Sequence, residues 1–198
     1  GLYNFAIDRE RAERIKLMLP SVDLLARSNR DWLRRSVRYL VGRGVRQLID
    51  IASGLPTVGN THEVAHALDP QARVIYVDND HSAVVHGDDI LATEPLVAMA
   101  EVDGKYPDQV WSHPAVRELI DLSQPVGIVL GGLLVFVEDD EDPAGLVAAY
   151  RDALAPGSYI AMSHLSADTA DEETRGQVDR MVAAYRAGVG ANLYVRDK

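Results

Sequence analysis

Two apolar runs in residues 47–80 constrain the fold of this chain more than any other feature. The first run ends at Asp50 and Ile51 and leads into a loop with Gly54, and the second begins at Arg73 and ends at Asp78. A helix-length segment separates them. This order is typical of a strand–loop–helix–strand unit in a parallel sheet. It predicts a cradle for a nucleotide or nucleoside, with an acidic residue at the end of each of two neighbouring strands.

The rest of the chain continues this alternation. At 198 residues with 47% hydrophobic content it is long enough for one full core, so we expect a single domain over 1–198, with a helical N-terminal segment (1–44) before an α/β core (45–198). Strands are expected at 46–51, 74–77, 96–102, 126–137 and 158–163, and helices at 9–19, 29–43, 60–68, 82–91, 107–122, 143–154 and around 178–185. Asn29 is the expected cap of the second helix. The pattern predicts a doubly wound, mainly parallel sheet.

Composition excludes several functions. Lysine plus arginine number 20 against 30 for aspartate plus glutamate, a net charge of −10, so a nucleic-acid partner is disfavoured. The arginines of 27–46 are interpreted as a solvated helix face. Cysteine is absent, which removes disulfides, thiolate nucleophiles and cysteine-ligated zinc. The histidines and acids of 80–89 are interpreted as exposed polar residues, and no metal site is expected.

The sequence shows neither a membrane-spanning segment nor a secretion signal, which favours the cytoplasm. No apolar run approaches the length of a membrane helix, and the N-terminus lacks the pattern of a signal peptide. We therefore expect a cytoplasmic protein without a membrane partner. A homodimer stays open.

The expected strand ends favour one kind of ligand. An acidic residue lies at or directly after the end of each of the first three apolar runs, at Asp50, Asp78 and Asp103. Carboxylates accept hydrogen bonds from ribose hydroxyls and amines, whereas they repel phosphates. The loop after Asp50 also has a single glycine, Gly54, where a dinucleotide fingerprint has three. A nucleoside with a neutral or cationic tail is favoured over NAD, and an NAD-dependent oxidoreductase is the weaker alternative.

Five motifs together resemble a known family. They are Asn4-Phe-Ala-Ile-Asp8-Arg-Glu10, Asn29-Arg-x-Trp-Leu-Arg-Arg, Leu48-Ile-Asp50-Ile-Ala-Ser-Gly54-Leu-Pro-Thr57 with Asn60-x-His62-Glu63, Val77-Asp78-Asn79-Asp80, and Pro156-Gly157-Ser-Tyr-x-x-x-Ser163-His164. The chain resembles class I S-adenosylmethionine-dependent methyltransferases, specifically the actinobacterial S-adenosyl methyltransferase family. The resemblance covers nearly the whole chain and implies a seven-stranded Rossmann-like sheet with S-adenosylmethionine as cofactor.

The resemblance also implies roles for individual residues. Asp50, Ala52 and Gly54 lie under the methionine part of the cofactor, Asp78 takes the ribose hydroxyls, Asp103 lies beside the adenine amine, and Gly131 with Gly132 floors the pocket. Asn60 and Asn79 complete the predicted cofactor set. The family usually has a histidine where this chain has Val135, and the string after Asp103 also departs from its pattern. The resemblance also implies a C-terminal hairpin after 193–196, which this sequence does not reach; truncation, disorder or a shortened sheet is expected there.

The reaction expected from the resemblance is methyl transfer to an unidentified small-molecule acceptor. It requires positioning above all, with a base only if the acceptor must lose a proton. His62 and His164 are candidate bases, and Tyr3 is a candidate orienting group. Residues 4–8 are a candidate lid, and the acidic run 138–142 is interpreted as a solvated loop with a helix cap. The alternative is a regulatory protein that binds S-adenosylmethionine without catalysis.

Overall fold

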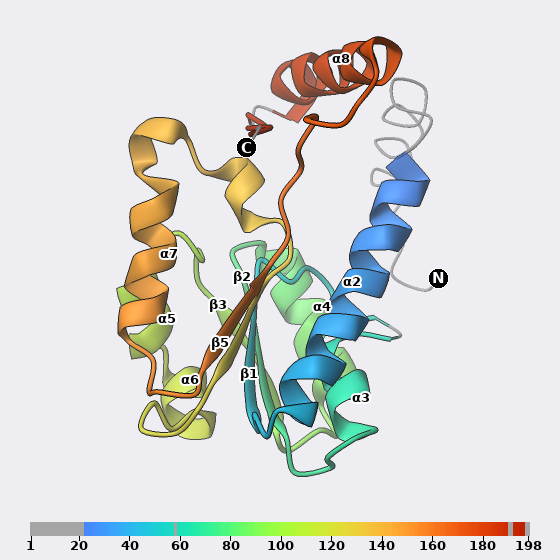
Figure 1. Cartoon of the computed structure of the whole chain (residues 1–198). Coiled ribbons are helices and arrows are strands. Elements are labelled where there is room, and N and C mark those ends of the chain that lie inside the picture. Colours follow the sequence, from blue (N-terminus) through green and yellow to red (C-terminus); the bar gives the residue numbers. More distant parts are fainter. Residues whose placement is uncertain (1–21, 58, 190–191, 197–198) are drawn as a thin grey trace.

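The computed structural model describes residues 22–57, 59–189 and 192–196 and contains a five-stranded parallel sheet (Figure 1). The strands are β1 (Gln47–Ile51), β2 (Arg73–Asp78), β3 (Val97–Glu101), β4 (Gly127–Leu130) and β5 (Tyr159–Met162), in the order β3-β2-β1-β4-β5. The helices are α2 (Val22–Gly42), α3 (Thr61–His66), α4 (His81–Leu91), α5 (Pro107–Ser112), α6 (Pro114–Leu119), α7 (Pro143–Asp152) and α8 (Glu172–Val189), with two 3₁₀ turns, η1 (Leu133–Phe136) and η2 (Asp139–Glu141). The expected doubly wound α/β sheet is confirmed.

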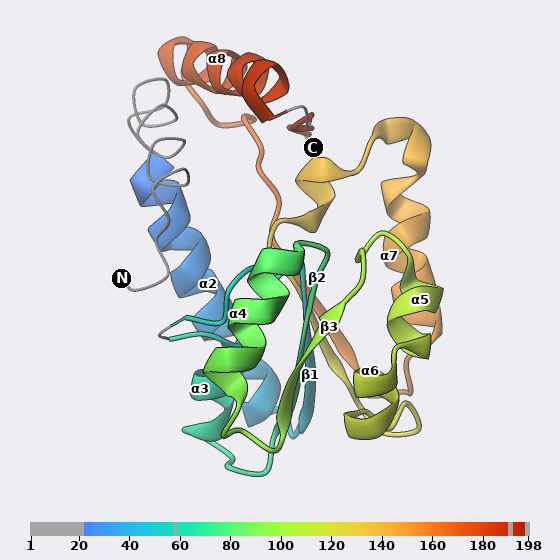
Figure 2. The same cartoon turned by 180° about the vertical axis from the view of Figure 1, so that it is seen from behind.

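Helices cover both faces of this sheet, as the views from front and back show (Figures 1 and 2). Successive strand residues point to opposite faces, so Leu48 packs with α2, α3 and α4, whereas Ile49 packs with α5, α6 and α7. Every residue of β1 and β4 is buried. This is why both strands are apolar almost throughout, and it makes Asp50 in β1 an exception that needs a polar partner.

The order of strands places a switch point between β1 and β4. Asp50 pairs with Tyr76 of β2 on one side and with Val129 of β4 on the other. Because the chain leaves β1 and β4 toward opposite faces, a crevice opens beyond their carboxyl ends. The loops after β1, β2, β3 and β4 all border this end of the sheet, where a ligand site is expected.

Three predicted elements are corrected by the structure. Asn29 lies within α2 and does not cap it. The helix expected at 107–122 is two helices, because Pro114 keeps His113 extended (φ −62°, ψ 134°) between them. The strand expected at 126–137 stops at Leu130, because Gly132 takes a φ of +129° and the chain enters η1.

Parts of the sequence-based hypothesis lie outside the described residues. These are the helix at 9–19, the candidate lid at 4–8 and the candidate orienting group Tyr3. Within residues 22–57, 59–189 and 192–196 the structure has five of the seven strands that the resemblance implied. No helix of this described part is both long enough and apolar enough to cross a membrane.

The chain returns to the carboxyl end of the sheet after α8. Tyr194 donates its backbone N–H to the carbonyl of Val135 at 2.7 Å. The guanidinium of Arg196 binds the carbonyl of Leu134 at 2.7 Å, the carbonyl of Val137 at 2.5 Å and Asp139 at 2.7 Å. Residues 192–196 are thereby fixed against η1 and η2, beside the crevice.

Candidate functional site

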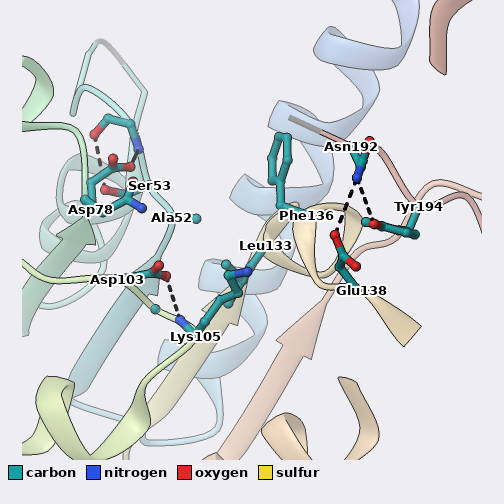
Figure 3. Close-up of a pocket in the computed structure, with 13 residues that line it drawn as sticks. Ala52, Ser53, Asp78, Asp103, Lys105, Leu133, Phe136, Glu138, Asn192 and Tyr194 are labelled. Atoms are coloured by element: carbon teal, nitrogen blue, oxygen red, sulfur yellow. Dashed lines mark hydrogen bonds between the residues drawn. The ribbon is translucent and has the colours of Figure 1, made fainter. Parts of the chain in front are cut away.

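A cavity of about 650 Å³ lies at the carboxyl ends of the strands (Figure 3), within the size range of small-molecule sites. It is lined by Ala52, Ser53, Gly54, Asp78, Asn79, Asp103, Gly104, Lys105, Leu133, Phe136, Glu138, Asn192 and Tyr194. The lining includes Ala52, Gly54, Asp78, Asn79 and Asp103 of the predicted cofactor set. The structure therefore brings these five predicted residues together, although the first and last of them, Ala52 and Asp103, are 51 positions apart in sequence.

Asp78 ties the end of β2 to the loop after β1. One carboxylate oxygen accepts the N–H of Gly54 at 2.7 Å, and the other accepts the N–H of Asp80 at 3.0 Å. A carboxylate has about four acceptor positions, so this side chain retains room for hydrogen-bond donors of a ligand. Asp80 instead caps α4 by accepting the N–H of Ser82 at 2.8 Å.

The loop after β1 has an unusual backbone where it borders the cavity. Ala52 and Gly54 both have positive φ, +56° and +63°, a region that residues with a Cβ rarely adopt. The N–H of Ser53 still binds the carbonyl of Val77 at 3.1 Å. Further along, the buried amide of Asn60 binds the carbonyl of Leu55 at 3.0 Å. The loop is thus held close to the strand ends, with no large side chain above the crevice at Ala52 or Gly54.

A second cavity of about 270 Å³ adjoins the first, because Ala52 and Ser53 line both. Its other lining residues are Ala26, Asn29, Arg30, Trp32, Leu33, Asp50, Asn60 and Gly131. It combines a carboxylate, Asp50, with a guanidinium, Arg30, whose Nη1 binds the hydroxyl of Thr57 at 3.4 Å. A space with both charges suits a zwitterionic group.

Asp50 is the buried acid of this second cavity. It is 5% exposed and accepts the hydroxyl of Thr61 at 2.6 Å. Burial raises the pKa of Asp50 to about 7, the bond from Thr61 opposes the rise, and the nearby charge of Asp78 adds to it. A cationic group beside Asp50 would restore the carboxylate form.

Asn29 connects three elements at the floor of this second cavity. Its amide N–H binds the carbonyl of Gly131 at 3.1 Å, and its oxygen accepts the hydroxyl of Ser163 at 2.7 Å. The side chain therefore fixes α2 to the ends of β4 and β5. Gly131 lines the second cavity as a result, whereas its neighbour Gly132, also predicted for the site, lines neither of the two cavities.

Asp103 belongs to a tight turn after β3. Its carboxylate accepts the N–H of Lys105 at 2.9 Å. A Cβ at Gly104 would overlap with the side chain of Ile51, and the carbonyl of Gly104 accepts the hydroxyl of Tyr150 at 2.7 Å. Glycine is thus required for this turn to pack on the sheet. The ammonium of Lys105 binds Glu141 at 2.7 Å and joins the turn to η2 across the cavity.

The two candidate bases lie away from both of these cavities. His62 is 7% exposed, and its Nδ1 is 2.7 Å from the hydroxyl of buried Tyr76, which also accepts the backbone N–H of His62. Burial lowers the pKa of His62. These contacts support a packing role over the role as a base.

His164 lines a separate apolar cavity of about 350 Å³ between β5 and α7, with Leu134, Met162 and Arg196 among its neighbours. Both ring nitrogens are buried without a hydrogen-bond partner in the described structure. Burial is the main cause that lowers the pKa of His164, and the charge of Arg196 adds to it. The ring is therefore kept neutral, and it does not line the space that Asp78 borders.

Several lining residues were not singled out from the sequence as site residues, although four of them lie in loops expected at the carboxyl ends of the strands. They are Arg30, Trp32, Lys105, Leu133, Phe136, Glu138, Asn192 and Tyr194. For Arg30 and Trp32 there is a signal, since both belong to the Asn29-Arg-x-Trp motif of the family resemblance. That motif received no predicted role in the site, and Arg30 was interpreted as part of a solvated helix face. The acidic run 138–142 contains the predicted helix cap, since Asp142 caps α7. It is nevertheless more than a solvated loop, because Glu141 pairs with Lys105 and Asp139 pairs with Arg196.

Comparison with known proteins agrees with this architecture. The chain matches the family model of S-adenosyl methyltransferases over residues 1–196. A putative methyltransferase from Thermobifida fusca YX is 40% identical, with a TM-score of 0.87 over 97% of this chain and 70% of that one. A DUF574 family protein from Streptomyces avermitilis MA-4680 is 32% identical, with a TM-score of 0.88 over 98% of this chain and 73% of that one.

A more distant structure shares the fold alone. The plantazolicin methyltransferase BpumL, solved with a monoazolic desmethylPZN analog and SAH, is 12% identical, with a TM-score of 0.50 over 92% of this chain and 68% of that one. The comparison with curated proteins gave no match. The family match over nearly the whole chain and the two close structures agree with the acid-lined crevice, and the chain therefore belongs to the S-adenosyl methyltransferase family, class I enzymes that use S-adenosylmethionine as cofactor.

Proposed function

We propose that this chain binds S-adenosylmethionine across the two adjoining cavities and transfers its methyl group to a small-molecule acceptor. The observation that carries the proposal is the shared wall of Ala52 and Ser53 between a cavity bordered by Asp78 and Asp103 and a cavity with Asp50 and Arg30. An adenosine with a zwitterionic amino-acid tail has the polarity that these two spaces require.

The larger cavity receives the adenosine in this proposal. Asp78 accepts the ribose hydroxyls with the acceptor positions that Gly54 and Asp80 leave free. Asp103 faces the adenine amine, and Asn79 lies beside the ribose. Positive φ at Ala52 and Gly54 keeps the loop close to the strand ends, so that its backbone can approach the sugar closely.

The smaller cavity receives the amino-acid tail. Asp50 pairs with the ammonium and Arg30 with the carboxylate, while Asn60 fixes the loop between them. Charge-assisted hydrogen bonds are roughly twice as strong as neutral ones, so both ends of the tail are recognised. Gly131, held by Asn29, forms the floor beneath it.

The transfer step requires little of the side chains. Bound S-adenosylmethionine supplies an electrophilic methyl group and a neutral thioether leaving group. The chain's residues hold the tail and the ribose so that the methyl group has one direction, and they exclude water from the space above Ala52. No general base is assigned, because His62 packs on Tyr76 and His164 lines another cavity.

Titration calorimetry tests the cofactor part of the proposal without knowledge of the acceptor. We expect S-adenosylmethionine and S-adenosylhomocysteine to bind with one site per chain and NAD to bind far more weakly, because four carboxylates line the two cavities. Tighter binding of NAD than of either sulfur nucleoside would overturn the proposal. Replacement of Arg30 by methionine should weaken S-adenosylmethionine more than adenosine, since only the former has a carboxylate.

A further inference from the structure

The larger cavity has a second end that the adenosine does not account for, and the inference drawn from it rests on the proposed function. Leu133 and Phe136 of η1 border this end together with Glu138, Asn192 and Tyr194. In Figure 3 these side chains lie across the cavity from Asp78 and Ser53, with Ala52 between the two groups. The tail leaves through the smaller cavity at Ala52, so the sulfur lies near this residue and its methyl group can face the second end.

The apolar side chains at this end favour a ligand with a flat or apolar group. Leu133 is buried, whereas Phe136 is 39% exposed although it is a large apolar side chain. The ring of Phe136 lies 6.3 Å from that of Tyr185 in α8, which keeps it beside the cavity. Aromatic rings offer large contact area and offset or edge contacts to another ring.

Glu138 gives this end of the cavity a negative charge. Glu138 is an acid of the lining, and its carboxylate has three partners: the amide of Asn192 at 3.4 Å, the hydroxyl of Tyr194 and a backbone N–H of η2. With about four acceptor positions and one partner at long range, it can accept a further donor. Its bond with Tyr194 raises the pKa of that phenol, so Tyr194 stays neutral.

Cations that could offset Glu138 are already engaged. Lys105, the one cation in the described lining, binds Glu141 at 2.7 Å. Arg196 is held by Leu134, Val137 and Asp139, and the Nε of Arg186 binds the oxygen of Asn192 at 2.7 Å. A carboxylate or phosphate at this end would therefore meet a carboxylate without a free positive partner.

From these contacts we propose that the methyl acceptor binds between Phe136 and Glu138 and is an alkyl amine that bears an aromatic ring, with the ring against Phe136 and Leu133 and an N–H donor to Glu138. The acidic run alone is not the basis, since Asp139, Glu141 and Asp142 have partners elsewhere. Such an amine is an ammonium near neutral pH, so it first releases a proton to water. The lone pair of the neutral amine then attacks the methyl carbon, the carbon–sulfur bond breaks and its electron pair stays on sulfur. The positive charge passes from the sulfonium to the nitrogen, where Glu138 stabilises it.

Two probes that differ in one charged group test the proposal. Tyramine and 4-hydroxyphenylacetate share a phenol ring, but the first carries an ammonium and the second a carboxylate. We expect tyramine to bind the protein saturated with S-adenosylhomocysteine, in titrations followed by NMR, and 4-hydroxyphenylacetate to bind at least tenfold more weakly. Glu138→Gln should weaken tyramine roughly tenfold, because the neutral amide still caps η2 but lacks the charge.

Asp140→Asn provides the matched control, since Asp140 is exposed in the same acidic run and does not line the cavity. It should bind tyramine like the unaltered protein. No binding of tyramine, equal binding of the carboxylate, or the same effect of both variants overturns the proposal. Binding of S-adenosylhomocysteine distinguishes failure of the cofactor proposal from failure of the acceptor proposal. If the unaltered protein does not bind S-adenosylhomocysteine, the cofactor proposal is refuted. If both variants bind it normally, any failure concerns the acceptor alone.

Discussion

The carboxylate of Asp78 accepts the backbone N–H of Gly54 at 2.7 Å, so one side chain at the end of β2 fixes the loop after β1. The same carboxylate borders the larger cavity. Replacement of Asp78 by alanine removes both the loop contact and the acceptor for the ribose hydroxyls. We expect the affinity for S-adenosylmethionine to fall by about 1.5 to 3 kcal/mol, the range for hydrogen bonds to a charged group, as measured by calorimetry.

Asp80 is the control for this variant, because it lies two residues away and caps α4 without lining either cavity. Asp80→Ala should lower the melting temperature and leave the affinity unchanged. An Asp78→Ala protein that binds S-adenosylmethionine normally would show that this acid serves only the loop.

Burial of Asp50 predicts a pH dependence of cofactor binding. The pKa of Asp50 is raised to about 7, so the folded protein without ligand carries a proton there below this pH. An ammonium pairs with the carboxylate form only. The dissociation constant for S-adenosylmethionine should therefore rise by up to tenfold per pH unit below about 7 and level off above it. Asp50→Asn should bind more weakly at pH 8 and lose this slope.

Ionisation of Asp50 has the opposite effect on the stability of the folded protein without ligand. Between its unfolded pKa of 3.8 and about 7, Asp50 is ionised in the unfolded chain and protonated in the folded one. Its contribution to stability is therefore full below pH 3.8 and is lost as the pH rises through 7. Urea unfolding of the unaltered protein and Asp50→Asn at pH 5 and pH 8 measures it. A steeper loss with pH in the variant would contradict the assignment.

Thr61 sets how far the pKa of Asp50 rises, because its hydroxyl donates to the carboxylate at 2.6 Å. Thr61→Val keeps the shape but removes the donor, so the pKa of Asp50 should increase further. The pH at which S-adenosylmethionine affinity levels off should then move upward. Thr61→Ser retains the hydroxyl and should restore the original profile. Equal profiles for the valine and serine variants would rule out this role.

The sheet and its acidic strand ends could be predicted because they depend on local patterns. Buried parallel strands are apolar throughout, and Asp50 and Asp78 interrupt that pattern at the ends of two such runs. The scarcity of glycine after β1 disfavoured a pyrophosphate ligand for a similar local reason. Cofactor chemistry thus follows from neighbouring residues in a few short segments.

The contribution of α2 to the second cavity and the far end of the first cavity could not be predicted in this way. Asparagine is a common helix cap, yet the side chain of Asn29 binds Gly131, which is 102 residues away. Asn192 and Tyr194 reach the cavity only because the chain returns after α8. The end of β4 was also missed, since 126–137 is apolar throughout and only the positive φ of Gly132 marks the turn. Long-range contacts of this kind leave little local signal.

Tyr76 and His62 form a buried pair whose role should be structural. The phenol accepts the backbone N–H of His62 at 2.8 Å and contacts its Nδ1 at 2.7 Å. Tyr76→Phe leaves these two buried groups unpaired, so the free energy of unfolding should fall by about 1 to 3 kcal/mol. Urea unfolding measures this loss. Tyr39→Phe, at a tyrosine that is 59% exposed, should change it little.

The affinity of Tyr76→Phe for S-adenosylhomocysteine distinguishes packing from a part in the site. Because neither Tyr76 nor His62 lines the two cavities, the folded variant should bind as the unaltered protein does. A large loss of affinity with normal stability would instead place the pair in the binding machinery.

The ion pair of Lys105 and Glu141 joins the turn after β3 to η2, and its worth can be measured by a double-mutant cycle. The ammonium and carboxylate are 2.7 Å apart and their side chains are 27% and 38% exposed. Solvent therefore screens the pair only in part, and we expect a coupling of about 0.5 to 1 kcal/mol from Lys105→Met and Glu141→Gln. The ion pair of the adjacent residues Arg151 and Asp152, whose side chains are 68% and 65% exposed, should give a coupling near zero. Added salt should weaken the first coupling, and a value no larger than that of the control pair would mean that the turn and η2 are held together by their other contacts.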